Sequence, residues 1–181
     1  EVSGDTYTQN RLKPKATWRV SMDGDIKDTF RNLDNVFDMS ERCFFTYYAT
    51  QNIDKTEEYL QVCQNEYTLI ASKIPEVAFS NIWIAQIIAD KIPANSYVHL
   101  GIFNSLRSWN FTQLPSNVYS VCNVGGFGID GTLSTVLGAS LVCPHRLHFV
   151  VLGDLAFFYD MNSLGNRYVG NNIRILLINN G

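Results

Sequence analysis

The stretch Leu147-His148-Phe149-Val150-Val151-Leu152-Gly153-Asp154 decides the fold class of this 181-residue chain. The residues before its glycine are almost continuously apolar, which is typical of a strand that is buried on both faces. Similar apolar segments recur along the second half of the chain, and segments with helical periodicity separate them. This alternation predicts an α/β protein in which helices cover both faces of a parallel sheet.

Working outward from this stretch, we expect strands and helices to alternate as far as the C-terminus. The predicted strands cover residues 97–102, 119–123, 147–152 and 173–178. The predicted helices cover residues 56–73, 81 to about 93, 106–111, 130–141 and 157–167. Ser80 is the expected N-cap of the second of these helices.

The first part of the chain is polar and rich in aromatic residues, and it lacks a sustained period. Residues 18–20 indicate a short strand. Residues 28–37 indicate a helix, because Phe30, Leu33 and Phe37 would share one face. We interpret this part as the tail of a preceding domain and not as a domain in itself.

We expect three regions along the chain. Residues 1–52 form the tail of the preceding domain, residues 53–77 a linker helix, and residues 78–181 a ligand-binding domain. The chain begins at Glu1 instead of Met and stops at Gly181, directly after an apolar run. We therefore expect a fragment of a longer protein, with the last domain incomplete at its C-terminus.

The composition excludes several classes of function. The net charge of −3 leaves no basic excess for general nucleic-acid binding, so we expect no nucleic-acid partner. The cysteines form no C-x-x-C pair and the histidines lack zinc-ligand spacing, which favours reduced thiols in a cytoplasmic protein. The N-terminus has no apolar signal region, and no apolar stretch is long enough to span a membrane.

Polar or glycine-rich residues follow each predicted strand. They are Asn104-Ser105, residues 125–128, Gly153-Asp154 and Asn179-Asn180. Parallel α/β sheets bind their ligands beyond the carboxyl ends of the strands. The sequence therefore predicts a ligand site at this edge of the sheet.

Gly153, Asp154 and Asn180 predict a site for a phosphate and a divalent cation. A glycine at a strand end lets a phosphate approach the backbone, and the next helix N-terminus favours negative charge. Asp154 would repel the phosphate unless a cation such as Mg²⁺ lay between them, with the Asn180 amide oxygen as a second ligand. Taken alone, Asp154 also fits a helix N-cap, and Asn179-Asn180-Gly181 also fits a turn. The joint occurrence of the two features at successive strand ends favours the metal site.

Residues 125–131 form a glycine-rich segment before a predicted helix. The segment contains no Gly-Lys-Ser/Thr, unlike a Walker A loop, and it lacks the full G-x-G-x-x-G spacing of a dinucleotide site. A tight turn in which Asp130 caps the next helix stays open as an alternative to a ligand loop.

Several motifs together resemble the thiamin-diphosphate-dependent enzymes. The run Gly-Asp-Leu-Ala-Phe-Phe-Tyr-Asp-Met-Asn over 153–162, followed by Asn179-Asn180, is similar to the Gly-Asp to Asn-Asn motif of that family. Gly128-Ile129-Asp130-Gly131 with Ser134-Thr135, and Asn104-Ser105, resemble the 2-succinyl-5-enolpyruvyl-6-hydroxy-3-cyclohexene-1-carboxylate synthases of menaquinone biosynthesis. The resemblance covers about residues 78–181.

The resemblance implies a truncated diphosphate-binding domain of the thiamin-diphosphate-binding fold, preceded by the end of a central domain over residues 1–52. It implies thiamin diphosphate and Mg²⁺ as cofactors, with Asp154 and Asn180 as metal ligands. Ile129 would have a catalytic role as the apolar wedge that holds the cofactor in a V-shaped conformation. The other residues that would contact the cofactor are Asn104, Ser105, Gly128, Gly153, Leu155 and Ala156.

The resemblance also implies a transferase of the decarboxylase and carboligase type. Such synthases decarboxylate 2-oxoglutarate on the cofactor and add the product to isochorismate. The whole enzyme would be a homo-oligomer, a dimer or a tetramer. A glutamate that activates the cofactor would lie in a domain outside this chain, so the chain alone is expected to be inactive.

Two positions depart from the family pattern and bear on the substrate. The family usually has arginines where this chain has Val124 and Trp109, and arginines pair well with substrate carboxylates. Ser105 and Arg107 are the candidate substrate contacts. A related enzyme with another 2-oxo acid and acceptor stays open, and so does a non-catalytic phosphate-binding or purely structural α/β domain.

Overall fold

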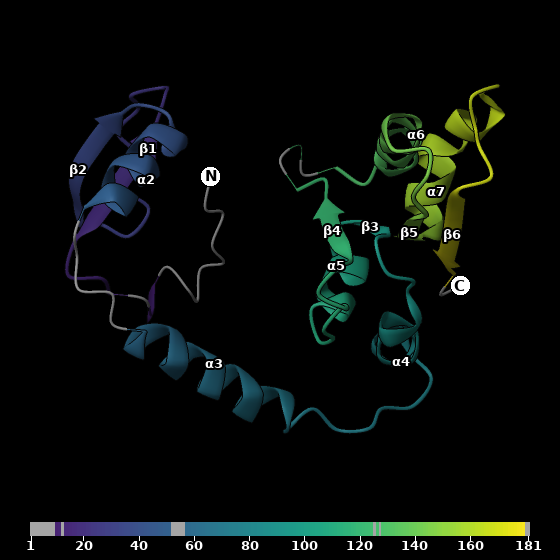
Figure 1. Cartoon of the computed structure of the whole chain (residues 1–181), viewed down its shortest axis with the longest axis horizontal. Coiled ribbons are helices and arrows are strands. Elements are labelled where there is room, and N and C mark those ends of the chain that lie inside the picture. Colours follow the sequence, from purple (N-terminus) through teal and green to yellow (C-terminus); the bar gives the residue numbers. More distant parts are fainter. Residues whose placement is uncertain (1–9, 12, 52–56, 125, 127, 180–181) are drawn as a thin grey trace. The chain divides into compact units, whose positions relative to one another are not determined.

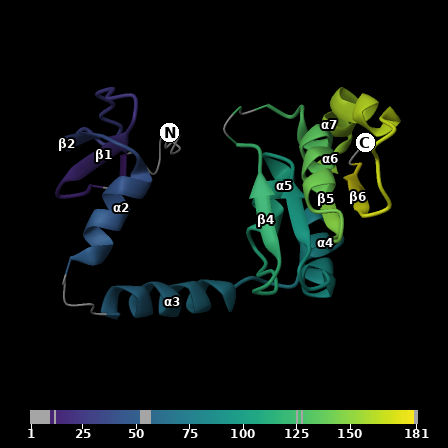
Figure 2. The same ribbon diagram turned by 45° about the horizontal axis from the view of Figure 1, so that its top comes forward.

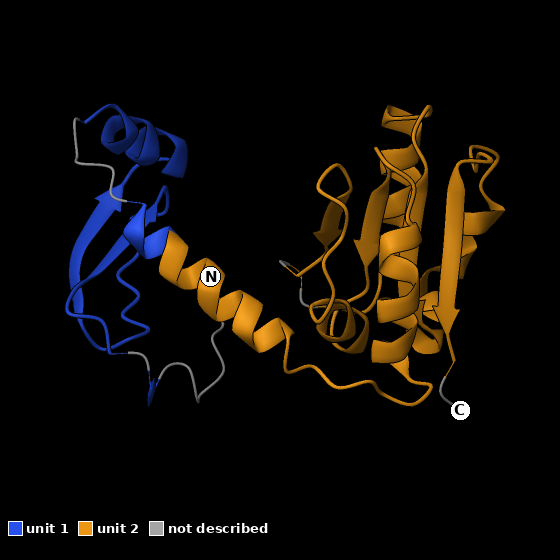
Figure 3. Cartoon of the chain, turned by 60° about the horizontal axis from the view of Figure 1, so that its bottom comes forward, with its two compact units in different colours: residues 1–60 blue, residues 61–181 orange. Residues whose placement is uncertain are grey.

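The computed structural model describes residues 10–11, 13–51, 57–124, 126 and 128–179 (Figure 1). The packing of the backbone divides the chain into two compact units, residues 1–60 and 61–181 (Figure 3). Helix α3, Glu58–Ala71, crosses the boundary between the units and lies inside the expected linker region. The division into the three regions expected from the sequence stays a prediction.

The first unit contains a small parallel sheet and a helix. The strands are β1, Thr17–Ser21, and β2, Leu33–Asp38, and the helix is α2, Glu41–Thr50. Strand β1 confirms the expected strand at residues 18–20. Aromatic side chains from these elements pack together, and they belong to Trp18, Phe37, Phe44 and Tyr48.

The prediction of a helix over residues 28–37 is wrong, because the second half of this segment is strand β2. Arg31 adopts a positive φ of 56°, which an α-helix does not contain. Strand β2 pairs in parallel with β1, and the ring centroids of Phe37 and Trp18 lie 5.5 Å apart. The apolar spacing of so short a segment fits a helix and a strand alike, so pairing with another strand decides its structure.

The second unit is built on a four-stranded sheet with the strand order β4-β3-β5-β6, and every neighbouring pair is parallel. The strands are β3, Tyr97–Leu100; β4, Tyr119–Cys122; β5, His148–Gly153; and β6, Ile173–Ile178. The helices are α4, Asn81–Ile88; α5, Asn104–Trp109; α6, Thr132–Val142; and α7, Asp154–Asp160. Short 3₁₀ helices follow α4 and α7, namely η1, Ala89–Lys91, and η2, Met161–Gly165. The expected strands are confirmed, with small shifts at their ends.

The side chains of β5 alternate between the two faces of the sheet, as in any strand. Val151 packs in a buried cluster with α4 and α5, whereas Val150 and Leu152 pack in another with α6 and α7. The first cluster also contains Ala85, Ala89 and Trp109, and the second contains Leu133, Val136 and Ala156. Helices therefore cover both faces of the sheet (Figure 1 and Figure 2), which confirms the expected fold class.

Two helices begin at residues other than those expected. The N-cap residue of α6 is Gly131, with a left-handed φ of 79°, so Asp130 is not the helix cap. Glycine adopts this backbone conformation at little cost. Helix α7 begins directly at Asp154 and passes into η2 after Asp160, so the helix expected over residues 157–167 starts earlier and ends sooner.

Two buried histidines lie next to each other on β3 and β5. His99 is 4% exposed and His148 is 0% exposed. His148 Nε2 lies 3.2 Å from the carbonyl oxygen of Cys143 and donates to it, so His148 Nδ1 accepts from His99 Nε2 at 3.3 Å. His99 Nδ1 is buried and has no hydrogen-bond partner within the described part of the chain. Burial of the His99 ring favours its neutral form in the folded protein.

This pair predicts a loss of stability in mild acid. Burial, reinforced by His148, lowers the pKa of His99 from 6.5 to about 4. Between these values the unfolded chain binds a proton that the folded chain does not bind. The free energy of unfolding should therefore fall as the pH is lowered from about 6.5 towards 4. Urea unfolding at a series of pH values measures this slope, and His99→Leu should flatten it.

His145→Gln provides the matched control, since His145 is exposed. This variant should keep the pH dependence of the unchanged chain. The same slope in His99→Leu as in the unchanged chain would show that His99 is not the group responsible.

Candidate functional site

The strand order creates a switch point between β3 and β5. From β3 the chain passes through α5 to β4, on one side, and from β5 it passes through α7 to β6, on the other side. The segments that leave these two neighbouring strands therefore diverge. Ligands of open α/β sheets bind in the crevice that such a divergence opens.

A hollow of about 230 Å³ lies at this switch point. Its lining includes most of the residues that the sequence predicted for the cofactor, and these are Asn104, Ser105, Ile129, Gly153, Asp154, Leu155 and Ala156. The fold thus brings together the start of α5, the segment before α6 and the junction of β5 with α7. Complete small-molecule sites occupy roughly 300–1,000 Å³, so this hollow has the size of part of a site.

Not every predicted residue lines this hollow. Gly128 precedes the lining residue Ile129 but is not itself part of the lining. Arg107 is exposed, and its guanidinium carbon lies 5.6 Å from the ring centroid of Phe103, outside the hollow. Asn180 lies outside the described residues, so its place relative to Asp154 stays a prediction.

Gly153 and Asp154 form the junction between β5 and α7. Gly153 has an ordinary φ of −75°, and a Cβ added there would meet no atom within 4 Å. The glycine therefore leaves open space beside the backbone, as the approach of a phosphate requires. Asp154 is partly buried, and its Oδ1 accepts a hydrogen bond from the backbone N–H of Leu155 over 2.8 Å.

Asp154 is the only ionisable residue among those that the structure places around the hollow. A phosphate there would meet a like charge unless a cation lay between the two groups. The described residues contain no cluster of three or more His, Cys, Asp or Glu side chains that could hold a metal ion. The carboxylate of Asp154 could supply one oxygen ligand to a cation that takes others from a phosphate.

The segment between β3 and α5 turns sharply at Phe103. This residue has φ 63° and ψ −117°, a conformation that non-glycine residues rarely adopt. Holding it there costs roughly 1–3 kcal/mol, and such strain tends to occur at functional sites. The turn directs Asn104 and the buried Ser105 to the hollow.

Ile129 supplies an apolar side chain to the same hollow. It packs on the buried cluster of Leu133, Val136, Val150 and Leu152. The side chain therefore has support from the core on one side while it lines the hollow on the other. This arrangement gives the site a fixed apolar surface near the carboxylate of Asp154.

The two positions that depart from the family pattern lie outside the hollow. Trp109 is 4% exposed and belongs to the core cluster that packs on α4, so it has a structural role. Val124 is exposed. No cationic side chain lines the hollow within the described ranges of the chain.

Sequence reasoning missed Asn81, which also lines the hollow. It is the first residue of α4, directly after Ser80, whose hydroxyl caps the helix by accepting from the N–H of Trp83 over 3.2 Å. The cap was predicted from the sequence, but no motif links α4 to the strand ends. Only the packing of the helix brings Asn81 to the site. The other lining residues are Ile102, Phe103 and Ile178.

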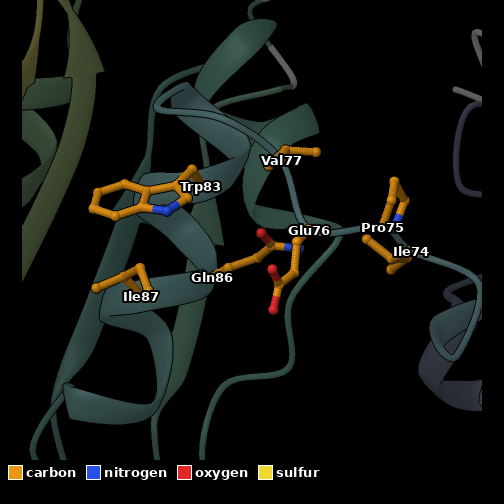
Figure 4. Close-up of a pocket in the computed structure, with 7 residues that line it drawn as sticks. All are labelled: Ile74, Pro75, Glu76, Val77, Trp83, Gln86 and Ile87. Carbon is orange, nitrogen blue, oxygen red and sulfur yellow. The ribbon is translucent and has the colours of Figure 1, made fainter.

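A larger hollow, of about 480 Å³, lies elsewhere in the second unit (Figure 4). Its lining is mainly apolar and consists of Ile74, Pro75, Glu76, Val77, Trp83, Gln86 and Ile87. It includes none of the residues predicted for a cofactor, and it does not lie at the strand ends. Volume alone therefore does not identify the site, and the smaller hollow at the switch point has the relevant chemistry.

No protein-family model matches the chain. The chain is 37% identical over 169 residues to a 2-succinyl-5-enolpyruvyl-6-hydroxy-3-cyclohexene-1-carboxylate synthase of Bacteroides fragilis, a match that covers 93% of this chain and 30% of the relative. Synthases of the same name from Bacteroides thetaiotaomicron and Phocaeicola vulgatus are 36% and 35% identical, over 93% and 96% of this chain and 30% of each relative.

The chain thus spans about 30% of the length of these curated relatives. Within that part, the similarity extends along nearly the whole chain. Over nearly its whole length, the chain is therefore similar to one part of the 2-succinyl-5-enolpyruvyl-6-hydroxy-3-cyclohexene-1-carboxylate synthases.

Proposed function

We propose that this chain is the part of a thiamin-diphosphate-dependent synthase that holds the diphosphate end of the cofactor. The observation that carries the proposal is the meeting of Asn104-Ser105, Ile129 and residues 153–156 around one hollow. These segments are distant in sequence, and the resemblance assigns each of them to the same cofactor. They lie at the edge where α/β sheets bind their ligands.

The cofactor, when bound, would act as an electron sink for the decarboxylation of a 2-oxo acid. The chain's own residues would bind and orient it. Gly153 leaves room for the diphosphate, and Leu155 and Ala156 would offer backbone groups at the start of α7. Asn104 and Ser105 would donate hydrogen bonds to the diphosphate or to the substrate.

Ile129 would support the cofactor by apolar contact. A flexible molecule with two rings and a diphosphate tail gains reactivity when one conformation is held in advance. Ile129 is suited to this role because its side chain rests on the core, and Gly128 beside it would add little bulk. The residue would therefore act by shape and not by proton transfer.

Asp154 would bind Mg²⁺, and the ion would neutralise the diphosphate charge beside it. Magnesium takes oxygen ligands and is commonly held by one or two carboxylates together with phosphates. Asn180, whose place the structure does not describe, is the proposed second protein ligand. Asp154 is the one carboxylate among the described lining residues of the hollow, and this supports the proposal.

We take 2-oxoglutarate as the 2-oxo acid and isochorismate as the acceptor, following the family resemblance. The absence of a cationic side chain from the described lining favours a second candidate, a related enzyme that uses another 2-oxo acid and acceptor. We also propose a cytoplasmic homo-oligomer without nucleic-acid partners, in keeping with the net charge of −3. Within the described residues, no helix is long and apolar enough to cross a membrane.

The first test is turnover by the complete protein with thiamin diphosphate and Mg²⁺. Release of CO₂ from 2-oxoglutarate should depend on isochorismate if the acceptor is correct, and residues 1–181 alone should be inactive. Turnover of a different 2-oxo acid would favour the related enzyme. If the complete protein binds the cofactor but turns over no 2-oxo acid, the synthase proposal is rejected. A non-catalytic phosphate-binding domain would then be the remaining interpretation.

The second test is Asp154→Ala, which should abolish metal-dependent cofactor binding. Loss of a metal ligand should weaken binding by roughly 100-fold or more, since even outer-shell partners contribute 10–100-fold. Titration calorimetry of thiamin diphosphate with and without Mg²⁺ measures the effect. Asp90→Ala, which removes an exposed carboxylate on η1, is the matched control and should bind normally. Retained metal-dependent binding in Asp154→Ala would remove Asp154 from the metal site.

A further inference from the structure

The first residue of helix α7 lines the hollow, and its last residue contacts helix α6. Asp154 lines the hollow, whereas Asp160 is not part of the lining. The carboxylate of Asp160 accepts two hydrogen bonds from Ser134 of α6. The backbone N–H donates to Oδ2 over 2.6 Å, and the hydroxyl donates to Oδ1. One carboxylate therefore joins the C-terminal end of α7 to the first turn of α6.

The first turn of α6 needs an outside partner because its N-cap residue has no side chain. That residue is Gly131. The N–H groups of a first helical turn have no acceptor within the helix, and a negative charge beside them is favourable. In many helices the N-cap side chain accepts such a bond. In α6 a carboxylate from a later helix takes this place.

The bridge between Asp160 and Ser134 bears on the hollow through Ile129. Ile129 lies just before α6 and lines the hollow, and Asp154 lines the same hollow from the start of α7. A link between α6 and α7 therefore links the two parts of the chain that carry these residues. A change in the spacing of the helices would change the distance between Ile129 and Asp154.

Building on the proposed cofactor function, we propose that Asp160 is a positioning residue. Its bridge to Ser134 holds Ile129 and Asp154 at the spacing that a single cofactor molecule needs, and Asp160 does not touch the cofactor. Asp154 serves the diphosphate end, through the metal ion, and Ile129 serves the ring-bearing end. Asp160 therefore affects the binding only of ligands that are long enough to contact both Asp154 and Ile129.

A cap that merely stabilised the fold would behave differently. The buried side chains of Leu133, Val136 and Ala156 also join α6 and α7, so we expect the helices to stay packed when the bridge is removed. A general loss of stability would weaken every ligand of the hollow alike. Loss of positioning would weaken a ligand that spans both ends and spare a ligand that occupies only one end.

The test compares magnesium thiamin diphosphate with magnesium pyrophosphate, which has no rings, by titration calorimetry of the complete protein. Asp160→Ala should weaken binding of thiamin diphosphate by roughly 10-fold to 100-fold, as the loss of a supporting partner does. Its affinity for pyrophosphate should stay within about twofold. Asp160→Asn, which keeps an acceptor oxygen, and Ser134→Ala, which keeps the backbone bond, should lose less. If Asp160→Ala does not fold, Asp160→Asn and Ser134→Ala provide the test. The control variant Asp90→Ala should bind both ligands normally.

A double-mutant cycle with Ile129 identifies the route of the effect. In an Ile129→Ala background, Asp160→Ala should cause no further loss of thiamin diphosphate affinity, because the group that it positions is already gone. Additive losses, or an equal loss of pyrophosphate binding, would overturn the positioning role. Failure of the unchanged protein to bind thiamin diphosphate would overturn the proposed function itself and this inference with it, so the two failures are distinct.

Discussion

The burial of β5 on both faces is the constraint on which the second unit depends. The strand pairs with β3 on one side and β6 on the other, and its side chains enter both helix-covered cores. Burying a side chain such as Val150 or Leu152 contributes about 1.5–3 kcal/mol. A slip by one residue would exchange the two faces, so the register of β5 is strongly specified. Gly153 and Asp154 consequently leave the sheet at a fixed place.

The candidate site depends on connectivity more than on any single motif. Gly153 and Asp154 acquire their significance because β5 lies beside β3 and the segments after these strands run to opposite sides. The strained turn at Phe103 and the core-supported Ile129 then complete the hollow from two other parts of the chain. The result is a small site with an apolar surface and an open strand end, and Asp154 supplies the one carboxylate among its described lining residues.

Much of this arrangement was predictable because it rests on local patterns. Continuous apolar runs predicted the four strands, and Ser80 predicted the start of α4. Two of the errors have the same physical cause, which is that a partner distant in sequence decided the local structure. Pairing with β1 turned the second half of residues 28–37 into a strand. The first turn of α6 likewise relies on Asp160, which no local pattern at Gly131 reveals.

The sequence by itself determined the fold class, the four strands of the second unit and the residue types at the strand ends, because periodicity and composition are local properties. It also indicated the family, through motifs such as Gly153-Asp154. Only the tertiary structure decided which strand ends are neighbours, that Asn81 joins the hollow, and that Arg107 stays outside it. Strand order and helix packing depend on contacts between distant segments, and those contacts form only when the chain buries its apolar faces together.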